Sequence, residues 1–109
     1  MERALGTGAS NLAIPKQYLA VSIDRQQERV ARRQAAENRA YEPNLAMALN
    51  NLAIRLAETG DRAGAIAPAK EAVVVLRRLV ATEPHRKDDL DKAVEVLRQI
   101  REGADDEPE

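Results

Sequence analysis

The residues best suited to metal binding or proton transfer are few and lie close together. The chain has one histidine, His85, which is followed by Asp88, Asp89 and Asp91, and it has no cysteine. Tight metal sites usually draw on several histidines or cysteines. Acidic residues at the start of a helix are expected in any case, because they complement the helix dipole. We therefore expect neither a metal site nor a cofactor.

Nucleophilic catalysis has equally little support in the sequence. A serine or threonine nucleophile needs a neighbouring base, but no serine or threonine of this chain has a plausible base beside it in the sequence, and His85 is the only histidine. The segment Gly6-Thr7-Gly8 lacks the Lys-Ser or Lys-Thr pair that completes a phosphate-binding loop. We expect a protein that is not an enzyme.

The strongest local charge signal is a basic stretch formed by Arg25, Arg29, Arg32, Arg33 and Arg39. Such a stretch could bind a polyanion. However, Glu28 and Glu37 interrupt it, no aromatic residue within it could stack on bases, and the net charge of the chain is −1. We interpret it as a solvated helix face, and keep polyanion or nucleic-acid binding by residues 25–39 as a lesser alternative.

The composition favours an all-α protein of one domain. The 109 residues include 20 alanines but no phenylalanine or tryptophan, and a core of Ala, Leu, Val and Ile suits close-packed helices. No apolar run approaches the roughly 20 residues of a membrane span, and the N-terminal residues do not resemble a signal peptide. We expect a cytoplasmic protein without membrane association. Arginine (13) outnumbers lysine (4), which favours a bacterial source.

Helical periodicity is clearest in the middle of the chain. One helix face is formed by residues at i, i+4, i+7, i+8 and i+11, namely Leu45, Leu49, Leu52, Ala53 and Leu56. Gly60 is a natural helix stop, and Asp61 can cap a second helix, which we expect at 62–81. Its predicted inner face consists of Ala65, Ile66, Ala69, Ala72, Val73, Leu76 and Val80. Because residues 73–76 are apolar almost all round, this helix should be covered on more than one side.

A less regular helix is expected before this pair and another after it. The first spans residues 15–39, with Leu19, Ile23 and Val30 on one face. Glu42 precedes a proline, which disfavours helical backbone angles at Glu42, so we expect the helical structure to be interrupted there. Asp88 should cap the last helix, and Gly103 should end it. Its apolar stripe is Leu90, Ala93, Val94, Leu97 and Ile100. The predicted helical domain is thus 15–103, between a flexible N-terminus at 1–14 and an acidic disordered tail at 104–109.

The two connections both contain Glu-Pro, at residues 42–43 and 83–84, which suggests a repeat of 41 residues. When the sequence is aligned with itself at this shift, Val94 corresponds to Ala53. The residues that carry a family signature are Leu49, Leu52, Ala53, Leu56, Gly60, Ala65, Ala69 and Ala72. Their spacing resembles the tetratricopeptide repeat. The run LNNLA at 49–53 and the pair Ala67-Pro68 are similar to the kinesin-light-chain type of this repeat. The resemblance covers about 40 residues and implies a short α-solenoid of about four helices, with a complete repeat at about 44–84 between two partial ones.

The resemblance also implies a groove that holds a protein or peptide partner. The matching positions on the first helix of the repeat are Met47, Asn50, Asn51, Ile54, Ala57 and Glu58. Those on the last helix are Asp88, Asp91, Lys92, Glu95 and Gln99. An asparagine amide both donates and accepts, so it can hold the backbone of an extended peptide. Two alternatives stay open: the asparagines could be solvated or bonded within the fold, and the helix around residues 73–76 could mediate homo-oligomerisation.

Overall fold

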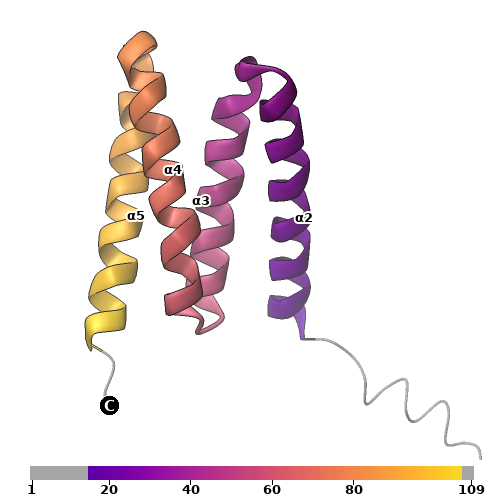
Figure 1. Ribbon diagram of the computed structural model, residues 1–109. Helices are drawn as coiled ribbons and strands as arrows, with labels where there is room; N and C mark the ends of the chain where they lie inside the picture. Colours follow the sequence, from indigo (N-terminus) through magenta and orange to yellow (C-terminus); the bar gives the residue numbers. More distant parts are fainter. Residues whose placement is uncertain (1–14, 107–109) are drawn as a thin grey trace, which may run out of the picture.

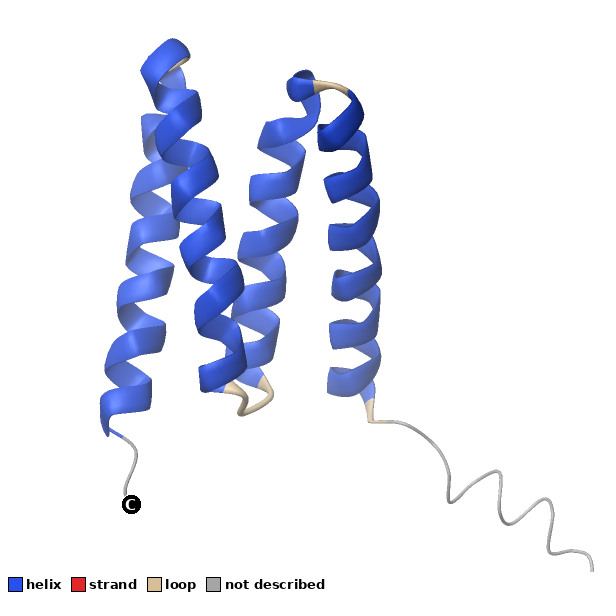
Figure 2. Cartoon of the chain, viewed as in Figure 1, coloured by secondary structure: helices blue, strands red, loops and turns tan. Residues whose placement is uncertain are grey.

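The protein folds into a row of α-helices. The computed structural model describes residues 15–106. Within this range it contains four α-helices and no strand (Figures 1 and 2). They are α2 (Lys16–Glu37), α3 (Glu42–Glu58), α4 (Arg62–Thr82) and α5 (Lys87–Asp106), and the short 3-10 segments η1 (Arg39–Tyr41) and η2 (Pro84–Arg86) precede α3 and α5. The predicted all-α fold is confirmed.

Each helix packs against the next one in the chain, so that α3 lies between α2 and α4, and α4 lies between α3 and α5 (Figure 1). α3 also touches α5 directly. This arrangement confirms that α4 is covered on more than one side. Val73, Val75 and Leu76 are buried, whereas Val74 is 51% exposed.

Alanines allow the close approach of α3 and α4. Ala53, Ala65, Ala69 and Ala72 have no exposed surface, and Leu49 is 2% exposed. A helix pair with small side chains at its contact can bring the two backbones close together, and the neighbouring leucines fill the remaining space. All five predicted core residues of α3 are buried. On α4 the buried face includes Val75 and Leu79 in place of the predicted Ile66 and Val80, which are half-buried.

The turn between α3 and α4 follows the prediction. Gly60 has a φ of 96°, a left-handed conformation that glycine adopts without steric cost. The Asp61 carboxylate accepts a hydrogen bond of 2.8 Å from the backbone N–H of Gly64, which satisfies one of the free donors at the start of α4.

The predicted break at Glu42 is wrong. Glu42 has helical backbone angles and is the first residue of α3. The extended residue is Asn38, with φ −150° and ψ 116°, and its side chain accepts a 2.9 Å hydrogen bond from the N–H of Ala40. Pro43 is tolerated because the first turn of a helix has no internal partner for its N–H.

The ends of α5 also differ from the prediction. Lys87 begins the helix, so Asp88 lies in the first turn and is not the cap. The helix runs past Gly103 to Asp106, and Gly103 does not adopt the left-handed φ that would end it. Residues 104–106 of the predicted disordered tail are thus helical. Residues 107–109 and the predicted flexible segment 1–14 lie outside the described part of the chain.

Burial does not follow the predicted 41-residue shift between α3 and α5. That shift equates Val94 with Ala53, but Val94 is 40% exposed and Ala53 is fully buried. A shift of 44, which carries Leu56 onto Ile100, places every buried or half-buried apolar residue of α5 on a buried residue of α3. The α5 residues are Leu90, Ala93, Val96, Leu97 and Ile100, and their counterparts are Ala46, Leu49, Leu52, Ala53 and Leu56.

Candidate functional site

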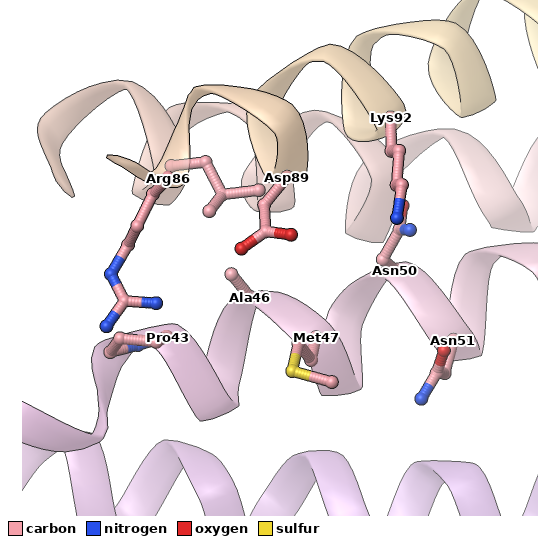
Figure 3. Close-up of a pocket in the computed structure, with 9 residues that line it drawn as sticks. Pro43, Ala46, Met47, Asn50, Asn51, Arg86, Asp89 and Lys92 are labelled. Atoms are coloured by element: carbon pink, nitrogen blue, oxygen red, sulfur yellow. The ribbon is translucent and has the colours of Figure 1, made fainter. Parts of the chain in front are cut away.

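A hollow of about 280 Å³ lies between α3 and α5, and it reaches Leu76 of α4. Three residues predicted for the partner groove, Met47, Asn50 and Asn51, lie along it on α3. The complete lining consists of Pro43, Ala46, Met47, Asn50, Asn51, Leu76, Arg86, Asp89 and Lys92. In Figure 3 the side chains of α3 and of the α5 region face one another across this space.

The α3 side of the hollow combines an apolar and an amide surface. Met47 is 63% exposed. Asn51 is exposed, whereas Asn50 is half-buried. The side-chain oxygen Oδ1 of Asn50 is buried and has no hydrogen-bond donor among the described residues. A buried carbonyl oxygen without a donor is energetically costly and is rare in native proteins. This oxygen is therefore the most unusual polar atom of the site.

The α5 side carries charges of both signs. Asp89 and Lys92 are exposed, and Lys92 and Asn50 point toward each other (Figure 3). Arg86 lies in η2 and is half-buried, and its Nε donates a 2.5 Å hydrogen bond to Oε1 of Glu83. The Arg86 guanidinium is thereby oriented by a residue that lies outside the hollow. The site can offer donors from two cations and an acceptor from one carboxylate.

Three further predicted residues of α3 do not line the hollow. Ile54 and Ala57 are half-buried, and Ala57 packs against the core cluster that contains Leu56. Glu58 accepts a 3.1 Å hydrogen bond from Nη1 of Arg55.

The three acidic residues predicted on α5, Asp88, Asp91 and Glu95, and the predicted Gln99 do not line the hollow. Asp91 and Glu95 form local ion pairs. Asp91 accepts from Nζ of Lys87 at 3.3 Å. Glu95 accepts from Arg98 and, at 2.9 Å, from Gln99. The bond from Arg98 is the main reason why the pKa of Glu95 lies below its usual value.

The sequence reasoning placed Lys92 in the groove and missed five other members of the site, Pro43, Ala46, Leu76, Arg86 and Asp89. Leu76 was assigned to the core, where it is also buried. Arg86 was treated as part of a connection, and Asp89 as one of several acidic residues at a helix start. The signal that would have found them is the 44-residue register, since it places Arg86 and Asp89 opposite the first turns of α3.

His85 lies in η2, just before the acidic first turn of α5. The His85 side chain is 71% exposed, and its Nε2 lies 3.9 Å from Glu83 Oε1. Within residues 15–106, no group of three or more His, Cys, Asp or Glu side chains is placed to hold a metal ion.

Two arginine-centred ion pairs hold α2 in place. Arg32 donates to both carboxylate oxygens of Glu71 on α4, at 2.8 and 2.9 Å, and to Glu28 at 2.6 Å. These bonds raise the pKa of Arg32 and lower that of Glu71. Asp24, which is 8% exposed, accepts a 3.0 Å bond from Arg55 on α3. Part of the basic stretch therefore has a structural role.

No helix within residues 15–106 combines the length and apolar character needed to cross a membrane. No family model, curated protein or solved structure matches the chain.

Proposed function

We propose that this protein is a non-catalytic interaction module that holds an extended segment of a partner protein in the hollow between α3 and α5. The observation that carries the proposal is the buried Oδ1 of Asn50, which lacks a donor and belongs to a residue lining the hollow. Because this oxygen has almost no accessible surface, a partner peptide can supply that donor from its backbone once the half-buried Asn50 side chain turns its amide oxygen toward the hollow.

The chemistry of the lining fits a peptide better than a small apolar molecule. A backbone N–H of the bound segment donates to Asn50, and the Asn51 amide offers one more donor and acceptor. Met47 supplies an adaptable apolar contact. Arg86 and Lys92 favour acidic side chains next to this contact, while Asp89 favours a basic one. The partner is thus selected by backbone hydrogen bonds together with a mixed charge pattern.

The architecture supports a tetratricopeptide-like reading of the central hairpin. The alanines that carry the resemblance, Ala53, Ala65, Ala69 and Ala72, are the fully buried ones at the contact of α3 and α4. In such a repeat the first helices of successive units line a shared concave surface, which is the relation of α3 to α5 in this proposal.

The test is selection of binding peptides from a random library displayed on phage, using the folded chain as bait. Selected peptides should perturb the NMR amide signals of Met47, Asn50 and Asn51. Their affinity should fall about tenfold with Asn50→Ala together with Asn51→Ala, without loss of helical circular dichroism. Gln99→Ala, an exposed amide on α5 outside the hollow, is the matched control. Peptides that bind the double variant as tightly as the parent would refute the groove.

Self-association through residues 73–76, the alternative function, would have little exposed apolar surface available. Of these four residues only Val74 is exposed, since the other three are covered by neighbouring helices.

A further inference from the structure

The outer face of α2 exposes an unusual amount of apolar surface. Among the described residues, eight large apolar side chains are exposed, and four of them lie on α2. Three of these four, Leu19, Ile23 and Val30, share one face of the helix and are 46%, 56% and 38% exposed. The inner face contributes Val21, Ala31 and Ala35 to the core, so its only large apolar side chain there among the described residues is Val21. Because helices normally turn their larger apolar side chains inward, α2 has the composition of a helix covered on both sides.

The helix at the other end of the row, α5, has an outer face of different composition. The outer face of α5 is charged, and several of its charges pair within the helix: Arg98 bridges Glu95 and Glu102, and Lys87 pairs with Asp91. Its one exposed large apolar residue is Val94. A charged outer face is typical of the terminal helix of a helical stack. The outer face of α5 thus carries mainly charged residues, whereas the outer face of α2 carries exposed apolar ones.

A row of arginines runs along one side of the apolar stripe. Arg25, Arg29 and Arg33 recur every four residues and form no ion pair with any residue in the 15–106 range, in contrast to Arg32. Two hollows of about 550 and 400 Å³ share Gln26 and Val30. Arg29 and Arg33 line the first, while Ile23 and Gln34 line the second, which contains no charged residue. The cations thus flank the stripe on one side only.

We propose that the outer face of α2 docks an amphipathic helix of another protein, with apolar residues spaced to meet Leu19, Ile23 and Val30 and with Asp or Glu along one edge. The apolar ridge at Val30 between two hollows suits a helix whose side chains enter on either side. The unpaired arginines select acidic residues on the edge facing them. This site shares no lining residue with the groove between α3 and α5, so the two proposals can be tested independently.

Two other occupants fit the charges less well. If α2 of a second copy packed antiparallel across a two-fold axis, both arginine rows would lie on the same side of the interface and repel each other. A nucleic acid would satisfy the arginines, but it would leave the apolar stripe without an apolar partner.

The test uses two synthetic helical peptides with the same leucine stripe, one edged with glutamate and the other with lysine. Each is titrated against the full chain by fluorescence anisotropy. The glutamate peptide should bind about tenfold more tightly, because three screened arginine–carboxylate contacts contribute modestly and add together. Arg29→Glu with Arg33→Glu should reverse the preference. Arg77→Glu with Arg101→Glu, which changes two exposed arginines with no ion pair in the described range, should leave it unchanged.

A second pair of variants, one in the site and one control, tests the apolar part of the site. Ile23→Ser should weaken binding of the glutamate peptide about tenfold, while Val74→Ser, at a similarly exposed position on α4, should not. Circular dichroism checks that all variants are folded. Equal affinity for both peptides would overturn the proposal. So would equally tight binding of single-stranded DNA or of polyglutamate without the leucine stripe, and so would a dimer that Ile23→Ser converts to a monomer.

Discussion

Replacing Asn50 with leucine should make the protein more stable, although the change removes a polar residue from its proposed binding groove. Leucine has the same number and branching of side-chain heavy atoms as asparagine and places no polar atom at the position of the buried Oδ1. If this oxygen has no donor in the free protein, the substitution removes its desolvation cost. The same substitution should abolish binding of the selected peptides, because their backbone N–H loses its acceptor.

The expected magnitude follows from the burial of the oxygen. A buried polar atom without a partner costs about 1–3 kcal/mol, and the lower half of this range applies because the rest of Asn50 is half-buried. Leucine also has a higher helix propensity than asparagine, by about 0.5 kcal/mol. Asn51→Leu is the matched control, since it makes the same exchange at the next, exposed position of α3 and carries the propensity term alone. Asn50→Leu should therefore exceed Asn51→Leu in stability by about 1–2 kcal/mol.

The assay is urea denaturation of the parent and both variants, followed by circular dichroism. A gain of this size also raises Tm by about 4 °C or more for a domain of this length. The reasoning fails if Asn50→Leu is less stable than Asn51→Leu. That result would mean that Oδ1 has a partner in solution, such as a fixed water, and that the amide belongs to the fold.

Three further predictions concern the scaffold. Leu49→Ala, at a residue only 2% exposed, should lower the free energy of unfolding by about 2–5 kcal/mol, and a loss below about 1 kcal/mol would show loose packing. Gly60→Ala should cost about 1–2 kcal/mol from its φ of 96° alone, because no atom lies within 4 Å of an added Cβ; Gly60→Asn should recover part of this in the same urea assay. Arg32 lowers the pKa of Glu71, so this pair stabilises the fold above the unfolded pKa of the carboxyl and stops doing so as pH falls through the folded one. Urea denaturation should show Glu71→Gln less stable than the parent by up to about 1 kcal/mol at neutral pH and equal to it near about pH 2, and a difference that persists in acid would contradict this cause.

Much of the central hairpin could be predicted from its sequence because its signals are local. The leucines of α3 recur on one helix face, Gly60 supplies a left-handed turn, and Asp61 supplies a cap; each of these depends on residues within one or two helical turns. The same method failed where local signals allow two outcomes. A proline can follow a break or lie in the first turn of a helix, and Pro43 does the latter. Residues 73–76 are apolar all round, so periodicity could not tell that Val74 is the exposed one.

The candidate groove was only partly predictable, because it depends on the register between two helices that are far apart in the sequence. The α3 positions Met47, Asn50 and Asn51 follow from the resemblance of a single repeat. Their counterparts Arg86 and Asp89 lie opposite them only when α5 is shifted by 44 residues, and the Glu-Pro pairs suggested 41. A three-residue difference is close to one helical turn, so it keeps the apolar stripe nearly aligned while it moves the charged residues along the groove.

The comparison of α3 with α5 also bears on why an amide stands at position 50. In the 44-residue register Asn50 corresponds to Val94, which lies at an equivalent place on α5. The packing of these helices therefore accepts an apolar residue at this position, and the fold does not itself require an amide there. The two positions differ in what surrounds them: Asn50 lines the hollow opposite Lys92, whereas Val94 lies 40% exposed and lines none of the described hollows beside α3. Asn50 thus places an amide with a buried acceptor beside the hollow that a partner would occupy. An unpaired acceptor at this place is what binding in the groove would require, and the stability gain of Asn50→Leu measures the free-energy cost of keeping it.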